Sequence, residues 1–103
     1  MAEMKLFPVI DMQRTGRNIE RLRRAQGLSV QQVQDYFGFM HPQAVYKWQH
    51  GESLPSVDNL LALAHLLEVS MEEILVYEHQ ESSLTLNDYA PLTTEPAPLM
   101  WAA

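Results

Sequence analysis

The sequence predicts an all-α fold of five short helices followed by a flexible acidic tail. Capping residues and terminating glycines recur at short intervals from Thr15 onward, and apolar residues between them repeat every three or four positions, the spacing of one helix face. From His79 onward, Ser, Thr, Pro and acidic residues replace this pattern. We therefore expect an N-terminal arm over residues 1–14, a helical domain over 15–78 and a disordered tail over 79–103.

The first predicted helix runs from an N-cap at Thr15 to about Gln26, and Gly27 ends it in the left-handed conformation. At 100° per residue, Ile19 and Leu22 share one side of this helix, which is expected to pack. The opposite side is a stripe of four arginines: Arg14, Arg17, Arg21 and Arg24. This stripe is either a solvated helix face or a surface for anions.

Two further helices surround a tight turn. The second opens with a capping box of Ser29 and Gln32, in which each side chain accepts a hydrogen bond from the other residue's backbone amide, and Gly38 stops it. Pro42 opens the third helix, expected at about residues 42–49, because its missing N–H costs nothing at the first helical position.

The remaining helices complete the predicted core. Pro55 and Ser56 begin the fourth helix, and its apolar residues cover nearly its whole surface: Leu60, Leu61, Leu63, Ala64 and Leu67. We expect this helix to lie at the centre of the domain. A capping box that opens at Ser70 predicts a short fifth helix, anchored by Ile74 and Leu75.

Charge is distributed unevenly along the chain, whose formal net charge is −6. Residues 1–48 hold all seven basic residues and four acidic ones, a net charge of +3. The remainder holds nine acidic residues and no basic one, a net charge of −9. Any surface that binds an anion must therefore use the first half of the chain.

Composition excludes several classes of site. The absence of cysteine removes disulfides, thiolate metal sites and cysteine nucleophiles. No apolar stretch approaches the roughly 18 residues that cross a bilayer, and the N-terminus is a poor signal peptide, so we expect a cytoplasmic protein with no membrane partner. The histidines lack the spacing that converges on a metal: His41, His50, His65 and His79. No phosphate-binding glycine motif or nucleophile elbow occurs, so we expect no catalytic residue, no cofactor and no enzymatic activity.

The order and spacing of the helix caps, turn glycines and core residues resemble those of a known protein family. The residues concerned are Leu28 and Ser29, Gly38, the run from Val45 to Gly51, the run from Leu54 to Leu60, and the run from Leu67 to Ser70. Over about Gly16 to Val76, the chain resembles the Xre-type, Cro- and lambda-repressor-like helix-turn-helix family. The resemblance implies a five-helix DNA-binding domain in which the third helix enters the major groove.

The resemblance also implies which residues contact DNA. Gln43 and Tyr46 occupy base-reading positions, where Gln43 can bond adenine through both the oxygen and the nitrogen of its amide and Tyr46 can meet a thymine methyl group. The residues expected at or beside the sugar-phosphate backbone are Arg17, Gln31, Lys47 and His50. Backbone N–H groups at the start of the second helix are expected to face a phosphate.

The chain departs from the family pattern at four places. The turn before the third helix is one residue longer, with Phe39 and Met40 in place of a single apolar residue. Val30 replaces the usual Gln, which removes one expected contact. Gln34 replaces a small residue and must find a hydrogen-bond partner. Gln49 replaces the usual Glu, so the bond expected with Arg23 has a neutral acceptor.

Aromatic residues near the third helix have two expected roles. The spacing of Phe37 and Trp48 relative to the apolar residues Val45 and Leu60 places them on the packed faces of their helices. We therefore expect them to pack in the core rather than stack on bases. Tyr46 lies one residue off that face. We therefore expect Tyr46 to be exposed for contact.

These observations favour sequence-specific binding of double-stranded DNA by a transcriptional regulator, in particular a repressor. A single unit reads few bases, so we expect a homodimer on a two-fold operator. The alternative is a protein-interaction module, such as an antitoxin, antirepressor or DNA mimic, that acts through the acidic second half. The tail is expected to be disordered, or else to dock through its apolar residues on the domain, on a second protomer or on another protein partner.

Overall fold

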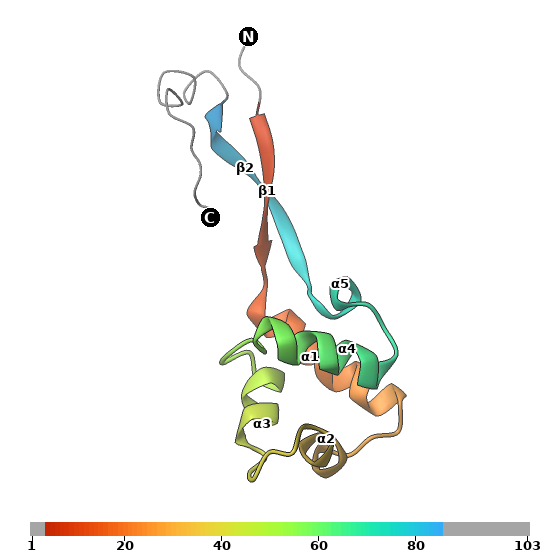
Figure 1. Ribbon diagram of the computed structural model, residues 1–103. Coiled ribbons are helices and arrows are strands. Elements are labelled where there is room, and N and C mark those ends of the chain that lie inside the picture. Colours follow the sequence, from red (N-terminus) through yellow and green to blue (C-terminus); the bar gives the residue numbers. More distant parts are fainter. Residues whose placement is uncertain (1–3, 86–103) are drawn as a thin grey trace. The chain divides into compact units, whose positions relative to one another are not determined.

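All five predicted helices are present in the computed structural model, which describes residues 4–85 (Figure 1). Their bounds are α1 Met12–Ala25, α2 Val30–Phe37, α3 Gln43–Gln49, α4 Val57–Leu67 and α5 Met71–Ile74. Together they form one unit over Ile10–Glu78. None of the helices in the described part of the chain has the length and apolar character needed to cross a membrane.

The start of α1 differs from the prediction. The helix begins at Met12, and Asp11 is its N-cap, because the Asp11 carboxylate accepts a hydrogen bond of 2.9 Å from the backbone amide of Arg14. Thr15, predicted as the cap, lies inside the helix and is fully buried. Asp ranks above Thr as an N-cap residue, so Asp11 was the stronger local candidate.

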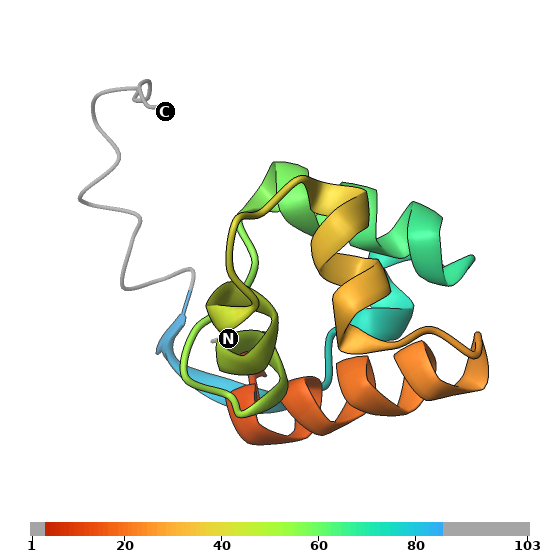
Figure 2. The ribbon, with the colours of Figure 1, turned by 90° about the horizontal axis from the view of Figure 1, so that it is seen from below.

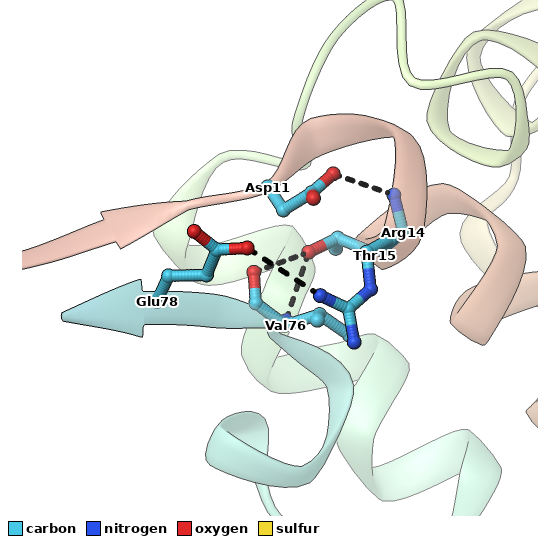
Figure 3. A network of polar contacts seen from close by, with 5 residues as sticks. All are labelled: Asp11, Arg14, Thr15, Val76 and Glu78. Carbon is cyan, nitrogen blue, oxygen red and sulfur yellow. Dashed lines mark hydrogen bonds and ion pairs between the residues drawn. The ribbon is translucent and has the colours of Figure 1, made fainter.

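Thr15 instead joins α1 to the segment that follows α5 (Figure 3). Its hydroxyl donates to the carbonyl oxygen of Val76 at 3.2 Å and accepts from the Val76 amide at 2.9 Å. The amide of Asp11 donates to the same carbonyl at 2.8 Å. An exposed ion pair of 3.7 Å between Arg14 and Glu78 lies alongside. These bonds thus join two segments that are more than sixty residues apart in the sequence.

The other helix boundaries follow the predicted signals. The capping boxes that open at Ser29 and Ser70 both form, and Ser56 caps α4. Gly27, Gly38 and Gly51 have φ values of 70°, 74° and 75°, the left-handed conformation in which a glycine ends a helix at little steric cost. Pro42 differs slightly, since it precedes the first helical residue instead of occupying it.

The core is built mainly from α4 and from the inner faces of α1 to α3. Its buried apolar residues are Ile19, Val33, Val45, Trp48, Leu60, Leu63, Ala64, Leu67 and Ile74. Phe37 packs against this cluster, so the core role expected for Phe37 and Trp48 is confirmed. The burial of α4 is less complete than expected for a central helix, because Leu61 remains 49% exposed.

Two strands were not predicted. β1 (Met4–Ile10) and β2 (Tyr77–Thr85) pair as a two-stranded antiparallel sheet (Figure 1). Residues 4–9 and 79–85 are the described part of a second unit. The sequence could not show this pairing, because β1 is a short run interrupted by Pro8 and β2 is mostly polar. The tail expected over 79–103 therefore begins with a strand, and residues 86–103 lie outside the described part.

Candidate nucleic-acid interface

One face of α3 carries four of the predicted contact residues. Positions spaced by three, four and seven residues share a side of a helix. The side chains on this face are Gln43, Tyr46, Lys47 and His50, and all four are exposed. The opposite face, made by Val45, Trp48 and Gln49, is buried. The exposure expected for Tyr46 is confirmed at 44%.

The position of α3 depends on a glycine in α1 that the sequence analysis did not single out. A Cβ atom added at Gly16 would lie 2.5 Å from the carbonyl oxygen of Gln49 and 2.6 Å from that of Trp48. The backbones of α1 and α3 can approach this closely only without a side chain at that point. Figure 2 shows α3 beside the N-terminal half of α1. A glycine inside a helical pattern was the available signal.

A buried arginine fixes the end of α3. The Nε atom of Arg23 donates to Oε1 of Gln49 at 2.8 Å, and its Nη1 atom donates to the carbonyl oxygen of Leu28 at 2.7 Å. Arg23 is only 9% exposed. The neutral-acceptor bond expected between Arg23 and Gln49 is therefore confirmed, and it links α1 to the last turn of α3. The bond to Leu28 links α1 to the turn that follows it.

The lengthened turn before α3 is held by aromatic packing. Phe39 stacks on Phe37 with ring centres 5.1 Å apart and meets Trp48 edge-on at 5.9 Å. The Nε2 atom of Gln34 donates to the carbonyl oxygen of Phe39 at 3.2 Å, which is the partner that Gln34 was expected to need. The additional residue is thus accommodated with Phe39 half-buried and Met40 exposed.

Tyr46 of α3 contacts His50, the exposed residue that caps the end of the helix. The rings of Tyr46 and His50 stack with centres 6.1 Å apart and an interplanar angle of 24°. The Nδ1 atom of His50 lies 3.8 Å from a carboxylate oxygen of Glu52, so protonated His50 would form an ion pair there. The stack restricts the directions in which Tyr46 can point.

Gln31 lies at the start of α2 and is exposed. Its Nε2 atom donates to Oδ1 of Asp35 at 3.0 Å, one helical turn further along. The capping box already provides acceptors for the amides of Ser29 and Gln32. This bond uses one of the two N–H groups of the Gln31 side chain, and the other can donate to another molecule.

Arg17 is exposed and belongs to the arginine stripe of α1. The structure pairs Arg14 with Glu78, Arg24 with Glu20 and Arg21 with Asn18, whereas Arg17 has no such partner among the described residues. A shallow hollow of about 250 Å³ is lined by Arg14, Arg17, Asn18, Arg21 and Val76. No residue of α3 contributes to this lining.

Titratable side chains do not gather into a metal site within residues 4–85. No group of three or more His, Asp or Glu side chains in that part of the chain is placed to hold an ion. The described residues thus offer exposed polar groups on α3 and guanidinium groups on α1.

Comparison with known families identifies this arrangement. A family model described as helix-turn-helix matches residues 19–74, which is more than half of the chain. The chain belongs to the Xre-type, lambda-repressor-like helix-turn-helix family. The matched segment of this helix-turn-helix protein runs from the buried Ile19 of α1 to the buried Ile74 of α5, so it contains α2, α3 and α4 completely.

Solved structures share the fold of this helix-turn-helix protein. The restriction-modification controller protein C.AhdI from Aeromonas hydrophila is 28% identical, with a TM-score of 0.56, and the match covers 62% of this chain and 96% of that one. The S. venezulae BldD DNA-binding domain is 24% identical with a TM-score of 0.54, covering 63% and 96%. Another BldD DNA-binding domain structure gives 24%, 0.55, 63% and 93%. A comparison with curated protein sequences found no significant match.

Proposed function

We propose that this protein is a transcription regulator that binds double-stranded DNA sequence-specifically through the exposed face of α3. The observation that carries the proposal is the division of α3 into two faces. Gln43, Tyr46, Lys47 and His50 lie outward, while the other face is held by the buried Arg23 and by close backbone contact at Gly16. A helix held in this way presents side chains in a fixed geometry, which base reading requires.

The contact residues divide by chemistry. Gln43 bonds adenine through both the oxygen and the nitrogen of its amide, and Tyr46 supplies a ring edge and a hydroxyl group to a neighbouring base. Lys47 and His50 contact phosphates from the same face. Gln31, at the start of α2, contacts the DNA backbone through the N–H group that its bond to Asp35 leaves available. Arg17 contributes a phosphate contact from α1, where its guanidinium group has no partner among the described residues.

The regulatory role follows from similarity to a regulator. C.AhdI is a restriction-modification controller, and nearly the whole of that protein is covered by the match. One domain of this size reads few bases, so the protein acts as a homodimer on a two-fold site. We propose repression as the specific form of this function, in which the bound dimer blocks transcription.

Selection from a random duplex library tests the proposal. Purified protein of confirmed helicity is expected to enrich one sequence motif, and its affinity is expected to fall modestly with salt because few cations face the DNA. A variant with Gln43→Ala and Tyr46→Ala provides the comparison, since both side chains are exposed and the fold should persist. Failure of the folded wild-type protein to enrich any sequence would overturn the proposal.

A second candidate is a protein-interaction module that presents acidic groups. After Lys47 the described chain has no basic residue, and its acidic side chains with assigned exposure all face solvent: Glu52, Asp58, Glu68, Glu72, Glu73 and Glu78. Such a surface fits a basic protein partner. Binding of labelled random duplex at low salt separates the candidates, because a DNA mimic would bind none.

A further inference from the structure

Among residues 6–80, for which exposure is assigned, Met40 is the most exposed large apolar residue. Its exposed fraction is 86%, compared with 78% for Val57 and 63% for Leu6. Turns at this kind of position are usually polar, because Gly, Asn, Asp and Ser suit their backbone conformations. Because the Met40 side chain buries little apolar surface there, it contributes little to the stability of the fold.

The backbone around Met40 is held on both sides. Before it, the amide of Phe39 donates to the carbonyl oxygen of Gln34 at 3.1 Å, and the Gln34 side chain bonds the Phe39 carbonyl in return. After it, the carbonyl oxygen of Pro42 accepts from the amide of Tyr46 at 3.1 Å, which joins Pro42 to α3. The exposure of Met40 therefore results from a packed turn that directs its side chain outward.

The turn lies directly in front of the proposed reading helix. In Figure 1 the connection between α2 and α3 forms the lower edge of the helical unit, and α3 rises from it. Met40 precedes Gln43, the first exposed residue of α3, by only three positions. A molecule that contacts the start of α3 therefore meets this turn as well.

We propose that Met40 determines specificity by packing against the 5-methyl group of a thymine next to the base that Gln43 reads. This inference rests on the proposed function. The thioether side chain offers no strong hydrogen bond, and the thymine methyl is the distinctive apolar group on base edges in the major groove. An unbranched, polarisable side chain can follow the groove surface, and its burial there recovers the apolar contact that the free protein lacks.

Removing thymine methyl groups one at a time tests this contact. In the duplex enriched by selection, each thymidine is replaced by deoxyuridine, which keeps base pairing and removes only the methyl group. The wild-type protein is expected to lose about fourfold in affinity at one such position, the effect of one buried methyl group. The variant Met40→Ala is expected to bind the unmodified duplex more weakly and to be insensitive to the replacement at that position.

Two substitutions and a matched control complete the experiment. Met40→Leu keeps an apolar side chain and should retain the sensitivity, whereas Met40→Gln keeps the length without the apolar end and should lose it. Val57→Ala truncates another exposed apolar side chain, on α4, and should bind like the wild type. Equal deoxyuridine penalties in wild type and Met40→Ala would overturn the inference while leaving DNA binding intact. Absence of any enriched duplex would overturn the proposed function and this inference with it.

Discussion

Arg23 donates from Nε to Oε1 of Gln49 across 2.8 Å, and this buried bond ties α1 to the last turn of α3. A second bond from the same guanidinium group reaches the carbonyl oxygen of Leu28. The cation is thus held by two neutral oxygens. Any change in the Gln49 acceptor alters both the stability of the domain and the placement of α3.

Gln49→Ala is expected to lower the free energy of unfolding by about 1.5–3 kcal/mol, because it leaves a buried charged donor with one acceptor fewer. Urea unfolding measures the change. Gln26→Ala is the control, since Gln26 is exposed and its side chain should contribute less than about 0.5 kcal/mol. Equal effects of the two substitutions would show that the bond to Arg23 contributes little.

Gly16→Ala should destabilise the protein even though it places a better helix former in α1. Elsewhere in a helix this change stabilises by about 1 kcal/mol. Here the new Cβ atom would lie 2.5 Å from a backbone oxygen, so α1 and α3 must separate, at an expected cost of about 1–3 kcal/mol. Thermal unfolding gives the sign directly. A melting temperature at or above that of the wild type would contradict the close approach of the two helices.

Asp58 should make the stability of α4 depend on acid pH. The hydrogen bond from the Ser56 hydroxyl, assisted by the backbone amides of Asp58 and Asn59, holds the pKa of Asp58 below its ordinary value of 3.8. A lowered pKa contributes stability above the ordinary value, and this contribution is lost as the pH falls through the folded value. The difference in unfolding free energy between wild type and Asp58→Asn should therefore be constant above about pH 5 and shrink below pH 3.8.

Chemical denaturation between pH 2 and pH 6 measures that difference. Asp35→Asn, on α2, is the matched comparison for an exposed aspartate on another helix. If the difference between wild type and Asp58→Asn does not change across this range, the bond from Ser56 has no stabilising role.

Local signals predicted the helices, because capping boxes and terminating glycines act within a few residues. Ser29, Ser70 and Gly38 behave as their sequence context indicates. The role of Thr15 could not be predicted in the same way, since its partner Val76 lies 61 positions away. Pairing between β1 and β2 depends on similarly distant residues.

The candidate site was predictable to the same extent. Helical spacing places Gln43, Tyr46 and Lys47 on one face whatever the tertiary structure. Arg17 shows what helical spacing cannot predict. The charge pattern of α1 gives the side of the helix on which Arg17 lies, but not the residues of other elements that lie near it. The hollow that Arg14, Arg17 and Arg21 share with Val76 depends on tertiary packing.

The most direct test of the central claim compares Gln43→Ala with Lys47→Ala on the enriched duplex and on its single-base variants. Gln43→Ala is expected to cost about 1–3 kcal/mol at one base pair and to abolish the preference there, because a base-specific contact is lost. Lys47→Ala is expected to weaken binding to every duplex alike and to lower the salt slope by about 0.9, because a phosphate contact is lost. Equal, sequence-independent losses from both substitutions would contradict base reading by α3.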